Sequence, residues 1–569
     1  MIRAALALGI THEPGYPLYV LMGRLFTLLP VGSPAFRLNL LSATAGAMAA
    51  GGLACLVYRL LLDPVRPACG RVAGWSCAAA AGWALGLAPT VWWQSVIAEK
   101  YAFSLFWFVV LLGVITAMTR EVRPAGVPMA GLVLGLAVAH HGQAVYAVPG
   151  FAVAVWFRLR GSRPGEWAES VLLLATTAVL GFSVKLVAIP IRAAAHPWPE
   201  WGNASAFDGW VAYLSARTYQ FRLFHWGASG TASRLADHAR TVLADEFGWG
   251  AVVLATAGLG WIGWRHRWRD LGWLLPGVAG AVFAAGFGLI TVSLRLYYLP
   301  AFAVFVVLAA FGLARALDLA RCRAVRLGLA AVVAGWIGWL VADRRQAADW
   351  SRYYLAYDHA RNILDSAGEG SILVAPGDYA YFPVAFLADV DRPESKTVVV
   401  MARAMPPGAA PQQLKRIQLI YPPHEAALAA RWPWGEDLIE FDPGRPVRFA
   451  VVSSAIERYT LANRGLAYAP VRGRQDLVPA RILRDRAWFR RWGRVRGLYD
   501  ARMPNDEHTR QLLVRYPFAD YWRGRLLAVQ GRCADAIPLY RAVLAAPREW
   551  PINRPGVVES MRACGGNPE

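Results

Sequence analysis

The chain has 569 residues, of which 56% are hydrophobic and 17% are charged, and its mean hydropathy is +0.33. This composition, with its repeated apolar runs of bilayer length, excludes a wholly soluble protein and predicts a multispanning membrane protein. Its 59 basic against 38 acidic residues give a net charge of +21. Because the arginines are scattered over connections between apolar runs, lipid head groups and topology explain them, and no nucleic-acid partner is expected.

Residues 1–35 are predicted to form an extracytoplasmic proline-rich loop followed by an interfacial helix. The loop, Thr11-His12-Glu13-Pro14-Gly15-Tyr16-Pro17, is preceded by only ten residues, and a spanning helix needs about 20. We therefore expect that a first membrane helix is missing and that the start codon is mis-assigned. No cleavable signal peptide is predicted, because the apolar stretch at 1–10 is too short.

Residues 36–342 are predicted to be the membrane domain, with ten apolar runs that include two short helices within 127–157. The runs are 36–62, 72–97, 102–119, 127–141, 143–157, 168–191, 248–264, 272–294, 298–316 and 327–342. Arginine-rich connections alternate with arginine-poor ones, and the positive-inside rule assigns the first set to the cytoplasm. These connections are 59–71, 120–123, 158–163, 265–269 and 315–326.

The opposite, extracytoplasmic side then receives the unusual polar residues. It holds the loop at 11–35, the Glu99-Lys100 turn, the His140-His141 turn, the long segment 192–247 and Arg295. The C-terminal part falls on the same side.

From about Asp343 onward, Pro, Arg, Asp and Glu interrupt every apolar run, which predicts a soluble part of the chain. Residues 343–510 are expected to form an α/β domain with strands near 371–378, 397–400 and 448–452. Residues 511–569 resemble one tetratricopeptide repeat, and a single repeat buries too little surface to be more than a helical hairpin. Cys533 and Cys564 are candidates for a disulfide, whereas the cysteines show no metal-ligand spacing, so no metal site is predicted.

Several motifs occur in an order that resembles one known family. They are His12-Glu13-Pro14-Gly15-Tyr16-Pro17-Leu18-Tyr19, Gly23-Arg24-Leu25-Phe26, Ser33 to Ala43, Gln94 to Ala102, His140-His141, His196-Pro197, Trp201-Gly202-Asn203, Tyr219, Gly377-Asp378 and Phe382-Pro383. The sequence is similar to the transmembrane protein 260-like family, protein O-mannosyltransferases of the GT-C membrane glycosyltransferase class. The resemblance implies that the α-helical multispanning fold predicted from the apolar runs, with about 10 spans, is GT-C-like. The C-terminal soluble α/β and helical-hairpin domain is predicted from the sequence pattern given above.

The sequence departs from the family pattern at three places. In relatives an Asp-Ser-Gly-Glu motif precedes the segment that aligns with residues 1–5, so the resemblance places the expected catalytic acid upstream of Met1. Glu13 stands where the family has the first proline of its loop, and Asn203 stands where it has an aspartate. Near Ser293, where relatives often carry an acidic residue, this chain has Arg295.

The resemblance implies transfer of a sugar from a polyprenyl-phosphate carrier to an acceptor hydroxyl at the outer face of the membrane. Such a reaction needs a general base for the hydroxyl and donors that stabilise the phosphate leaving group. Glu13, Glu99 and His12 are the catalytic candidates. The substrate-binding candidates are Arg24, Arg37, Asn39, Tyr16, Tyr101, His141, Trp201, Asn203, Tyr219 and Arg295.

Each of these residues also has an ordinary structural interpretation. The arginines beside apolar helices commonly extend to lipid head groups, and Glu99 can simply pair with Lys100. Glu13 can be a loop residue or a helix cap. His140 and His141 can satisfy backbone groups that a helix break exposes within the membrane. The aromatic residues of the long outer segment can form an interfacial belt.

We therefore expect a membrane glycosyltransferase in the cytoplasmic membrane of a bacterium, with an extracytoplasmic C-terminal domain. Its expected partners are the bilayer, a polyprenyl-phosphate sugar and a protein or glycan acceptor; no cofactor is predicted, and a divalent metal stays open. One alternative is a flippase or transporter of lipid-linked intermediates, although no inverted repeat is evident. Another is a non-catalytic membrane scaffold.

Overall fold

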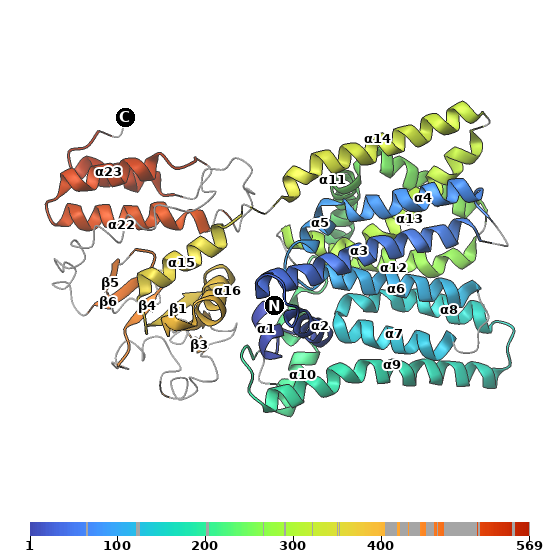
Figure 1. The fold of residues 1–569 in the computed structure, drawn as a ribbon, viewed down its shortest axis with the longest axis horizontal. Coiled ribbons are helices and arrows are strands. Elements are labelled where there is room, and N and C mark those ends of the chain that lie inside the picture. The colour runs from blue at the N-terminus through green and yellow to red at the C-terminus, as the bar shows by residue number, and fades with distance from the viewer. Residues whose placement is uncertain are drawn as a thin grey trace. The chain divides into compact units, whose positions relative to one another are not determined.

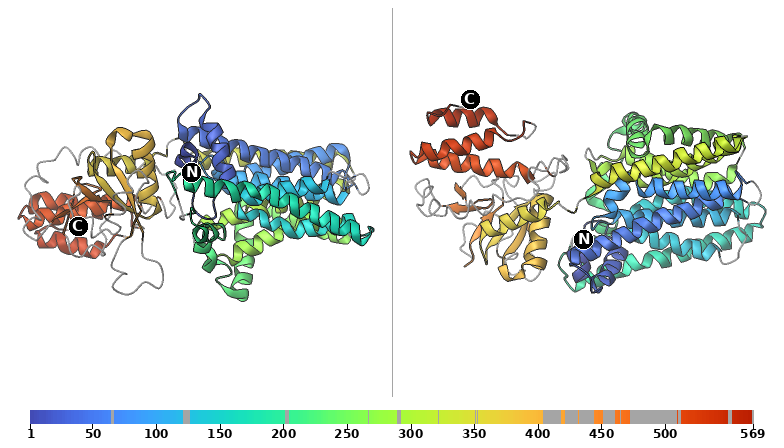
Figure 2. Two further views of the ribbon diagram at one scale, coloured as in Figure 1. Left: turned by 90° about the horizontal axis from the view of Figure 1, so that it is seen from below. Right: turned by 45° about the horizontal axis from the view of Figure 1, so that its top comes forward.

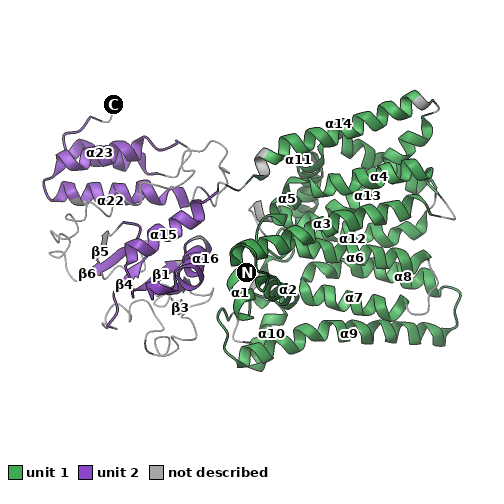
Figure 3. Ribbon diagram, in the orientation of Figure 1, with its two compact units in different colours: residues 1–349 green, residues 350–569 purple. Residues whose placement is uncertain are grey.

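The computed structural model describes most of the chain and divides it into two compact units, Met1–Asp349 and Trp350–Glu569 (Figure 3). The described residues are 1–63, 67–120, 126–200, 204–265, 267–288, 292–320, 322–349, 351, 353–403, 418–420, 431, 444–450, 460–463, 465–471, 509, 512–548 and 552–567. We call the first part the membrane unit and the second part the C-terminal unit.

The membrane unit is built almost entirely from helices (Figure 1). Its α-helices are α1 (Ile2–Ala7), α2 (Pro17–Thr27), α3 (Pro34–Leu61), α4 (Arg71–Gly86), α5 (Pro89–Ser95), α6 (Tyr101–Arg120), α7 (Gly126–His140), α8 (Val148–Leu159), α9 (Pro164–Ala194), α10 (Phe207–Leu214), α11 (Gly227–Trp264), α12 (Leu271–Gly286), α13 (Leu299–Leu319) and α14 (Arg323–Ala348). Short 3-10 helices are η1 (Gly142–Ala147), η2 (Arg217–Arg222), η3 (Trp268–Asp270) and η4 (Val292–Tyr298). The long helices run side by side, with α1, α2 and α10 at one end of the bundle (Figures 1 and 2).

Every apolar run expected from the sequence contains a helix, and the division of 127–157 into α7 and α8 is confirmed. Among the described residues, six helical segments are long and apolar enough to cross a membrane: Pro34–Leu61, Tyr101–Arg120, Pro164–Ala194, Val242–Trp264, Arg295–Leu319 and Ala324–Arg345. The remaining runs form shorter helices such as α7 and α12. The structure therefore shows an integral membrane architecture, and the full count of ten spans stays a prediction.

Small residues bring two pairs of long helices into close contact. Gly135 of α7 lies so near α9 that a methyl group there would overlap the carbonyl of Ala178, and Gly181 of α9 is equally close to Leu132. Gly312 of α13 approaches the Leu254 carbonyl of α11 in the same way. Membrane helices gain van der Waals contact by such backbone approaches, because lipid offers them little hydrophobic driving force.

The C-terminal unit contains a mixed sheet with helices beside it. Its described strands are β1 (Ile372–Pro376), β2 (Val398–Arg403), β3 (Gln418–Ile420), β4 (Val447–Phe449), β5 (Thr460–Asn463) and β6 (Tyr468–Val471), in the order β3-β2-β1-β4-β6-β5. β1 pairs in parallel with β2 and with β4, and the other pairs are antiparallel. The three strands expected from the sequence are thus neighbours at the centre of the sheet.

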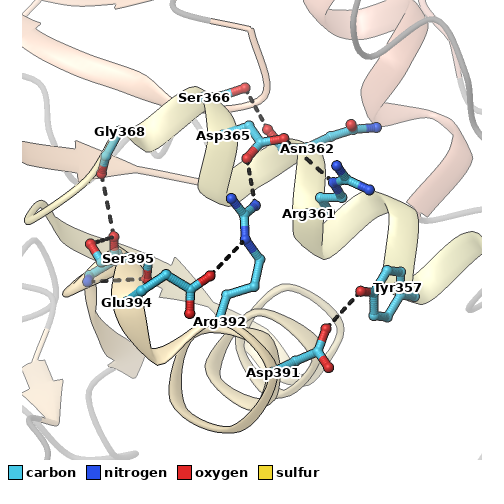
Figure 4. Close-up of polar contacts among 11 residues, drawn as sticks. Tyr357, Arg361, Asn362, Asp365, Ser366, Gly368, Asp391, Arg392, Glu394 and Ser395 are labelled. Carbon is cyan, nitrogen blue, oxygen red and sulfur yellow. Dashed lines mark hydrogen bonds and ion pairs between the residues drawn. The ribbon is translucent and has the colours of Figure 1, made fainter.

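Polar contacts fix helix α15 (Leu355–Ala367) to the segment between α16 (Gly377–Phe386) and β2 (Figure 4). Asp365 accepts a 2.7 Å bond from Arg392, and the Tyr357 hydroxyl donates to Asp391 at 2.7 Å. These side chains are partly exposed, so each pair contributes only about 0–1 kcal/mol.

The described residues of 512–567 form three short helices rather than the two of a simple hairpin: α22 (Arg515–Val529), α23 (Cys533–Leu544) and α24 (Arg554–Ala563). Tyr540, Val543 and Met561 form their shared apolar core. A disulfide joins Cys533 at the start of α23 to Cys564 just after α24, so the candidate pairing is confirmed.

Candidate functional site

A cavity of about 1010 Å³ lies in the membrane unit, at the upper limit of the size range of small-molecule sites. Its walls come from the loop after α1, the start of α6, the break after α7, the segment around η2, α12 and η4. The lining side chains that bear on function are His12, Glu13, Tyr16, Lys100, Tyr101, His141, Gln143, Tyr146, Tyr219, Gln220, Arg222 and Tyr297. Most of these positions lie in segments that the positive-inside rule assigns to the extracytoplasmic side.

Local contacts hold the proline-rich loop against the helices around it. The Thr11 hydroxyl accepts a hydrogen bond from the Tyr16 backbone at 3.2 Å, and the Thr11 carbonyl accepts one from the buried Tyr213 hydroxyl. Gly15 adopts a φ of +82° and leaves no room for a side chain beside the Tyr213 ring, so only glycine fits this position. Tyr16 is thereby directed to the cavity.

Lys100 supplies a buried positive charge at the cavity wall. Its side chain is only 7% exposed; its ammonium contacts the Glu99 carboxylate at 2.9 Å and lies over the rings of Tyr101, at 4.4 Å, and Tyr16, at 5.2 Å. Burial alone would raise the pKa of the Glu99 carboxyl, but neighbouring positive charge, that of Lys100 first, outweighs burial and lowers it. Glu99 is therefore ionised and serves as the counter-ion of Lys100.

Hydrogen bonds fix the tautomers of the two histidines at the cavity. The Nδ1 of His12 lies 3.0 Å from the Glu13 carbonyl, which can only accept, so Nδ1 carries the proton and Nε2 is left as a base. The Nδ1 of His141 instead accepts from the Gln143 backbone at 3.1 Å, which leaves Nε2–H as a donor. Burial lowers the pKa of His12 to about 4, and the Lys100 charge adds to this effect. His12 is consequently neutral at pH 7.

Aromatic contacts join these groups into one wall. The Tyr16 ring stacks on His141 with centroids 5.4 Å apart, and His12 meets the edge of Tyr16 at 5.2 Å. Tyr101 contacts Tyr297 at 6.3 Å. Rings arranged in this way give a rigid surface on which a sugar can stack.

Another part of the cavity wall is aliphatic. Helix α12 contributes Leu275, Val278, Ala279 and Val282. Val278 is 49% exposed, as expected of a side chain that faces lipid in a membrane helix. The cavity therefore joins a polar, cationic wall to an apolar wall that reaches the surface of the helix bundle.

Several residues expected at the site lie elsewhere in the described structure. Arg24 donates a hydrogen bond to the Leu6 carbonyl at 3.0 Å and thereby caps the C-terminal end of α1. Arg37 donates to the carbonyls of Thr27, Val31 and Gly32 at 2.6, 2.8 and 3.1 Å. Neither arginine is among the residues that line the cavity, and Asn39 on α3 also lies outside this set. Their roles in substrate binding stay predictions.

Arg295 is engaged by two acidic residues of α11 and is likewise not among the cavity-lining residues of the described chain. It contacts the exposed Asp245 at 2.9 Å and the fully buried Glu246 at 3.5 Å. Glu246 was not expected from the sequence, where its only signal is an acidic pair directly before an apolar run. Trp201 and Asn203 lie outside the described residues.

Sequence reasoning did not single out Arg222, Gln143 or Tyr297. Arg222 lines the cavity and lies over the ring of Tyr219, 5.9 Å from its centroid. Gln143 donates to the Leu296 carbonyl at 3.2 Å and so joins η1 to η4. Within the described ranges, no group of three His, Cys, Asp or Glu side chains is placed to hold a metal ion.

A second polar cluster lies at the other end of α6, where the arginine-rich connections meet. The buried Asp270 carboxylate accepts from Arg120 at 2.6 Å, from Arg267 at 2.5 Å and from the Trp273 ring nitrogen at 3.0 Å. Asp63 adds a further contact to Arg120 at 3.0 Å. Three connections that the positive-inside rule assigns to the cytoplasm are thus tied together.

These features define an integral membrane protein with an amphiphilic cavity at one end of its helix bundle. Residues 1–163 match the family described as the Protein O-mannosyl-transferase TMEM260 N-terminal domain. The mouse protein O-mannosyl-transferase TMEM260 is 26% identical over 401 residues, which are 66% of this chain and 55% of the mouse protein. The predicted resemblance to the TMEM260-like family is confirmed, and the match spans about half the length of that relative.

Proposed function

We propose that this protein is a membrane glycosyltransferase of the GT-C type that moves a sugar from a polyprenyl-phosphate donor to an extracytoplasmic acceptor. The mouse relative is named a protein O-mannosyl-transferase, so protein O-mannosylation is the specific reaction we propose. The observation that carries the proposal is the amphiphilic cavity. A polyprenyl phosphate has a long apolar tail and an anionic head, and the cavity has an apolar wall on α12 and cationic groups at Lys100 and Arg222.

In this proposal the acceptor hydroxyl attacks the anomeric carbon of the donor sugar. The bond from that carbon to the phosphate oxygen breaks, and its electron pair leaves with the polyprenyl phosphate. Lys100 and Arg222 offset the negative charge that develops on the phosphate, while His141 offers a neutral Nε2–H donor. The aromatic wall formed by Tyr16 and Tyr101 would hold the sugar.

The proton of the acceptor hydroxyl passes to Nε2 of His12, which is the free nitrogen of that ring. A pKa of about 4 makes His12 a weak base in the free protein. An anionic phosphate nearby favours the imidazolium ion and therefore raises the pKa toward the working range. Glu13 lines the same cavity and is the second candidate for the base. The Glu99 carboxylate is instead ion-paired with Lys100.

We further propose that the cavity and the C-terminal unit face the extracytoplasmic side. The disulfide between Cys533 and Cys564 supports this topology, because disulfides persist in oxidising compartments. Labelling of Cys533 and Cys564 by an impermeant thiol reagent in intact cells should require prior reduction with an impermeant reductant. Reactivity that appears only after the membrane is opened would reverse the topology.

The test of activity uses the full-length protein purified into liposomes with polyprenyl-phosphate mannose and a peptide acceptor. We expect mannosylated peptide and free polyprenyl phosphate in equal amounts. If the donor is moved across the bilayer without being consumed, the protein is a flippase. If the donor is neither consumed nor moved, whatever polyprenyl-phosphate sugar is supplied, the chain is a non-catalytic relative and the proposal fails.

A further inference from the structure

Glu246 is a buried carboxylate that connects α5 to η4, and each of these elements leads to residues of the cavity wall. Glu246 itself is not among the described residues that line the cavity. Its side chain has 0% exposure, and it lies on α11 just before the non-helical residue Gly248. One carboxylate oxygen accepts the backbone N–H of Thr90 at 3.0 Å. The other accepts the Thr90 hydroxyl at 2.5 Å and contacts the Arg295 guanidinium at 3.5 Å.

The first segment bound by Glu246 leads to Lys100. Thr90 is the second residue of α5, and α5 is followed by the short turn that carries Glu99 and Lys100. A carboxylate bonded to both the N–H and the hydroxyl of Thr90 fixes the N-terminus of this helix. The position of α5 in turn sets where the Lys100-Tyr101 part of the cavity wall begins.

The second segment bound by Glu246 leads to Tyr297. Arg295 lies in η4, two residues before Tyr297, and the intervening Leu296 carbonyl accepts the hydrogen bond from Gln143. Tyr297 lines the cavity and meets the Tyr101 ring at 6.3 Å. The same carboxylate therefore holds both aromatic residues of this contact, one through Thr90 and the other through Arg295.

We propose that Glu246 is a positioning residue that fixes Lys100 and Tyr101 relative to Tyr297. It thereby shapes the part of the cavity that these three residues line. Arg295 acts with it as a second positioning residue rather than as a ligand of the donor phosphate. The role in catalysis rests on the proposed function, whereas the effect on cavity geometry does not. Because catalysis depends on substrate placement within fractions of an ångström, loss of this arrangement lowers the rate without removing any group that contacts the substrate.

The chain offers a matched control for Glu246 in its neighbour Asp245. Both residues contact Arg295, but the Asp245 side chain is 55% exposed and accepts the shorter, 2.9 Å bond. Glu246→Gln removes the buried charge while keeping an oxygen that can accept from Thr90. Asp245→Asn removes a charge from the same arginine and leaves the link between α5 and η4 intact.

The experiment measures cavity geometry first, in full-length protein in liposomes that carries Tyr297→Cys. The rate at which a methanethiosulfonate reagent modifies this cysteine is followed by mass spectrometry of its peptide, which separates it from the native cysteines. We expect Glu246→Gln to change the rate severalfold and Asp245→Asn to leave it unchanged. Equal rates in all three proteins would overturn the proposal.

The second readout is sugar transfer by Glu246→Gln and Asp245→Asn in proteins that keep the native Tyr297. We expect kcat/KM for the donor to fall about 10- to 100-fold in Glu246→Gln and to stay near the wild-type value in Asp245→Asn.

If Glu246→Gln does not fold, Thr90→Val serves instead, because it removes only the hydroxyl contact and should change both readouts in the same direction. A lower melting temperature with normal labelling and normal KM would mean that Glu246 only stabilises the bundle. If the wild type transfers no sugar, the proposed function fails, and the labelling rates still decide whether Glu246 positions Tyr297.

Discussion

The two ends of helix α6 use charged residues in opposite ways. At its C-terminal end Arg120 is bound by Asp63 and Asp270, and Asp270 is bound in turn by Arg267, so the charges neutralise one another. At its N-terminal end Lys100 has a single 2.9 Å ion pair with Glu99 and otherwise meets aromatic rings and a cavity of about 1010 Å³.

This difference shows how to separate a stabilising charge from a functional one in a membrane protein. A buried ion whose contacts are all supplied by the protein contributes to stability or topology. A buried ion that borders a cavity keeps part of its electrostatic field available to a ligand. Mutations at the first end should therefore change stability, and mutations at the second end should change activity.

The largest expected effect is on activity, at His12. His12→Ala should lower the rate of sugar transfer by about 10²- to 10⁴-fold, because the acceptor hydroxyl loses its proton acceptor. His225→Ala is the control, because this exposed histidine is not among the described residues that line the cavity. Steady-state kinetics at saturating donor measures the effect. Unchanged kcat in His12→Ala would move the role of the base to Glu13.

The second prediction concerns stability at the opposite end. Asp270→Ala should lower the free energy of unfolding by about 3–5 kcal/mol, because Arg120 and Arg267 lose the buried carboxylate that they share. Thermal unfolding in detergent measures the loss, and Asp318→Ala, which removes an exposed ion pair with Arg315, is the control. A raised KM for the donor in folded Asp270→Ala protein would show that the charges at this end of α6 also affect activity.

Stability should also depend on pH through His12. An unfolded histidine titrates at about pH 6.5, whereas the pKa of His12 in the fold is about 4. Between these values the unfolded chain binds a proton that the folded chain does not, so the free energy of unfolding falls as the pH is lowered, by up to about 3 kcal/mol. His12→Gln should remove this part of the pH dependence in chemical unfolding curves. Identical curves for the two proteins would show that His12 titrates normally.

A smaller effect is expected where α7 meets α9. Gly135→Val should cost about 1–3 kcal/mol through overpacking, because the added side chain overlaps the Ala178 carbonyl. Gly113→Ala on α6 is the control, since a methyl group there has nothing within 4 Å. α7 ends at His140 beside the cavity, so Gly135→Val should also raise the KM for the donor. Thermal unfolding and donor kinetics together check this, and a stable variant with wild-type kinetics would contradict the close packing.

The smallest effect is expected at Arg37, whose three hydrogen bonds all go to backbone carbonyls. Arg37→Gln should lower stability by about 1 kcal/mol and leave the KM for the donor unchanged. Arg222→Gln is the comparison, because Arg222 lines the cavity, and its KM should rise. A rise in KM for Arg37→Gln alone would restore Arg37 as the phosphate ligand.

Much of the architecture follows from features that the sequence displays directly. Apolar runs mark the helices, and the polar residues that interrupt them mark the turns, so His12, Lys100, His141 and Tyr219 are conspicuous in the sequence itself. The strand at Ile372–Pro376 is equally visible as a short apolar run that is followed by a glycine.

Other parts of the site depend on contacts that a sequence does not encode locally. Arg24 and Arg37 bind carbonyls that become available only because α1 and α2 end where they do. Glu246 acquires its role because α5 and η4, distant in the chain, meet at α11. Arg222 lies in a long polar segment, where no periodicity distinguishes it from its neighbours.

The position at which a donor lipid binds decides whether the cavity is the donor site. A polyprenyl-phosphate mannose with a photoactivatable group on its tail is crosslinked to the protein in liposomes, and the labelled peptides are identified. We expect labelling of α12 around Leu275 and Val278 that is abolished by excess unlabelled donor. Helices α9 and α14, whose most apolar windows are 17% and 6% buried, provide the control for labelling by bulk lipid. Labelling confined to α9 and α14, or labelling of α12 that unlabelled donor does not reduce, would contradict the assignment of the cavity as the donor site.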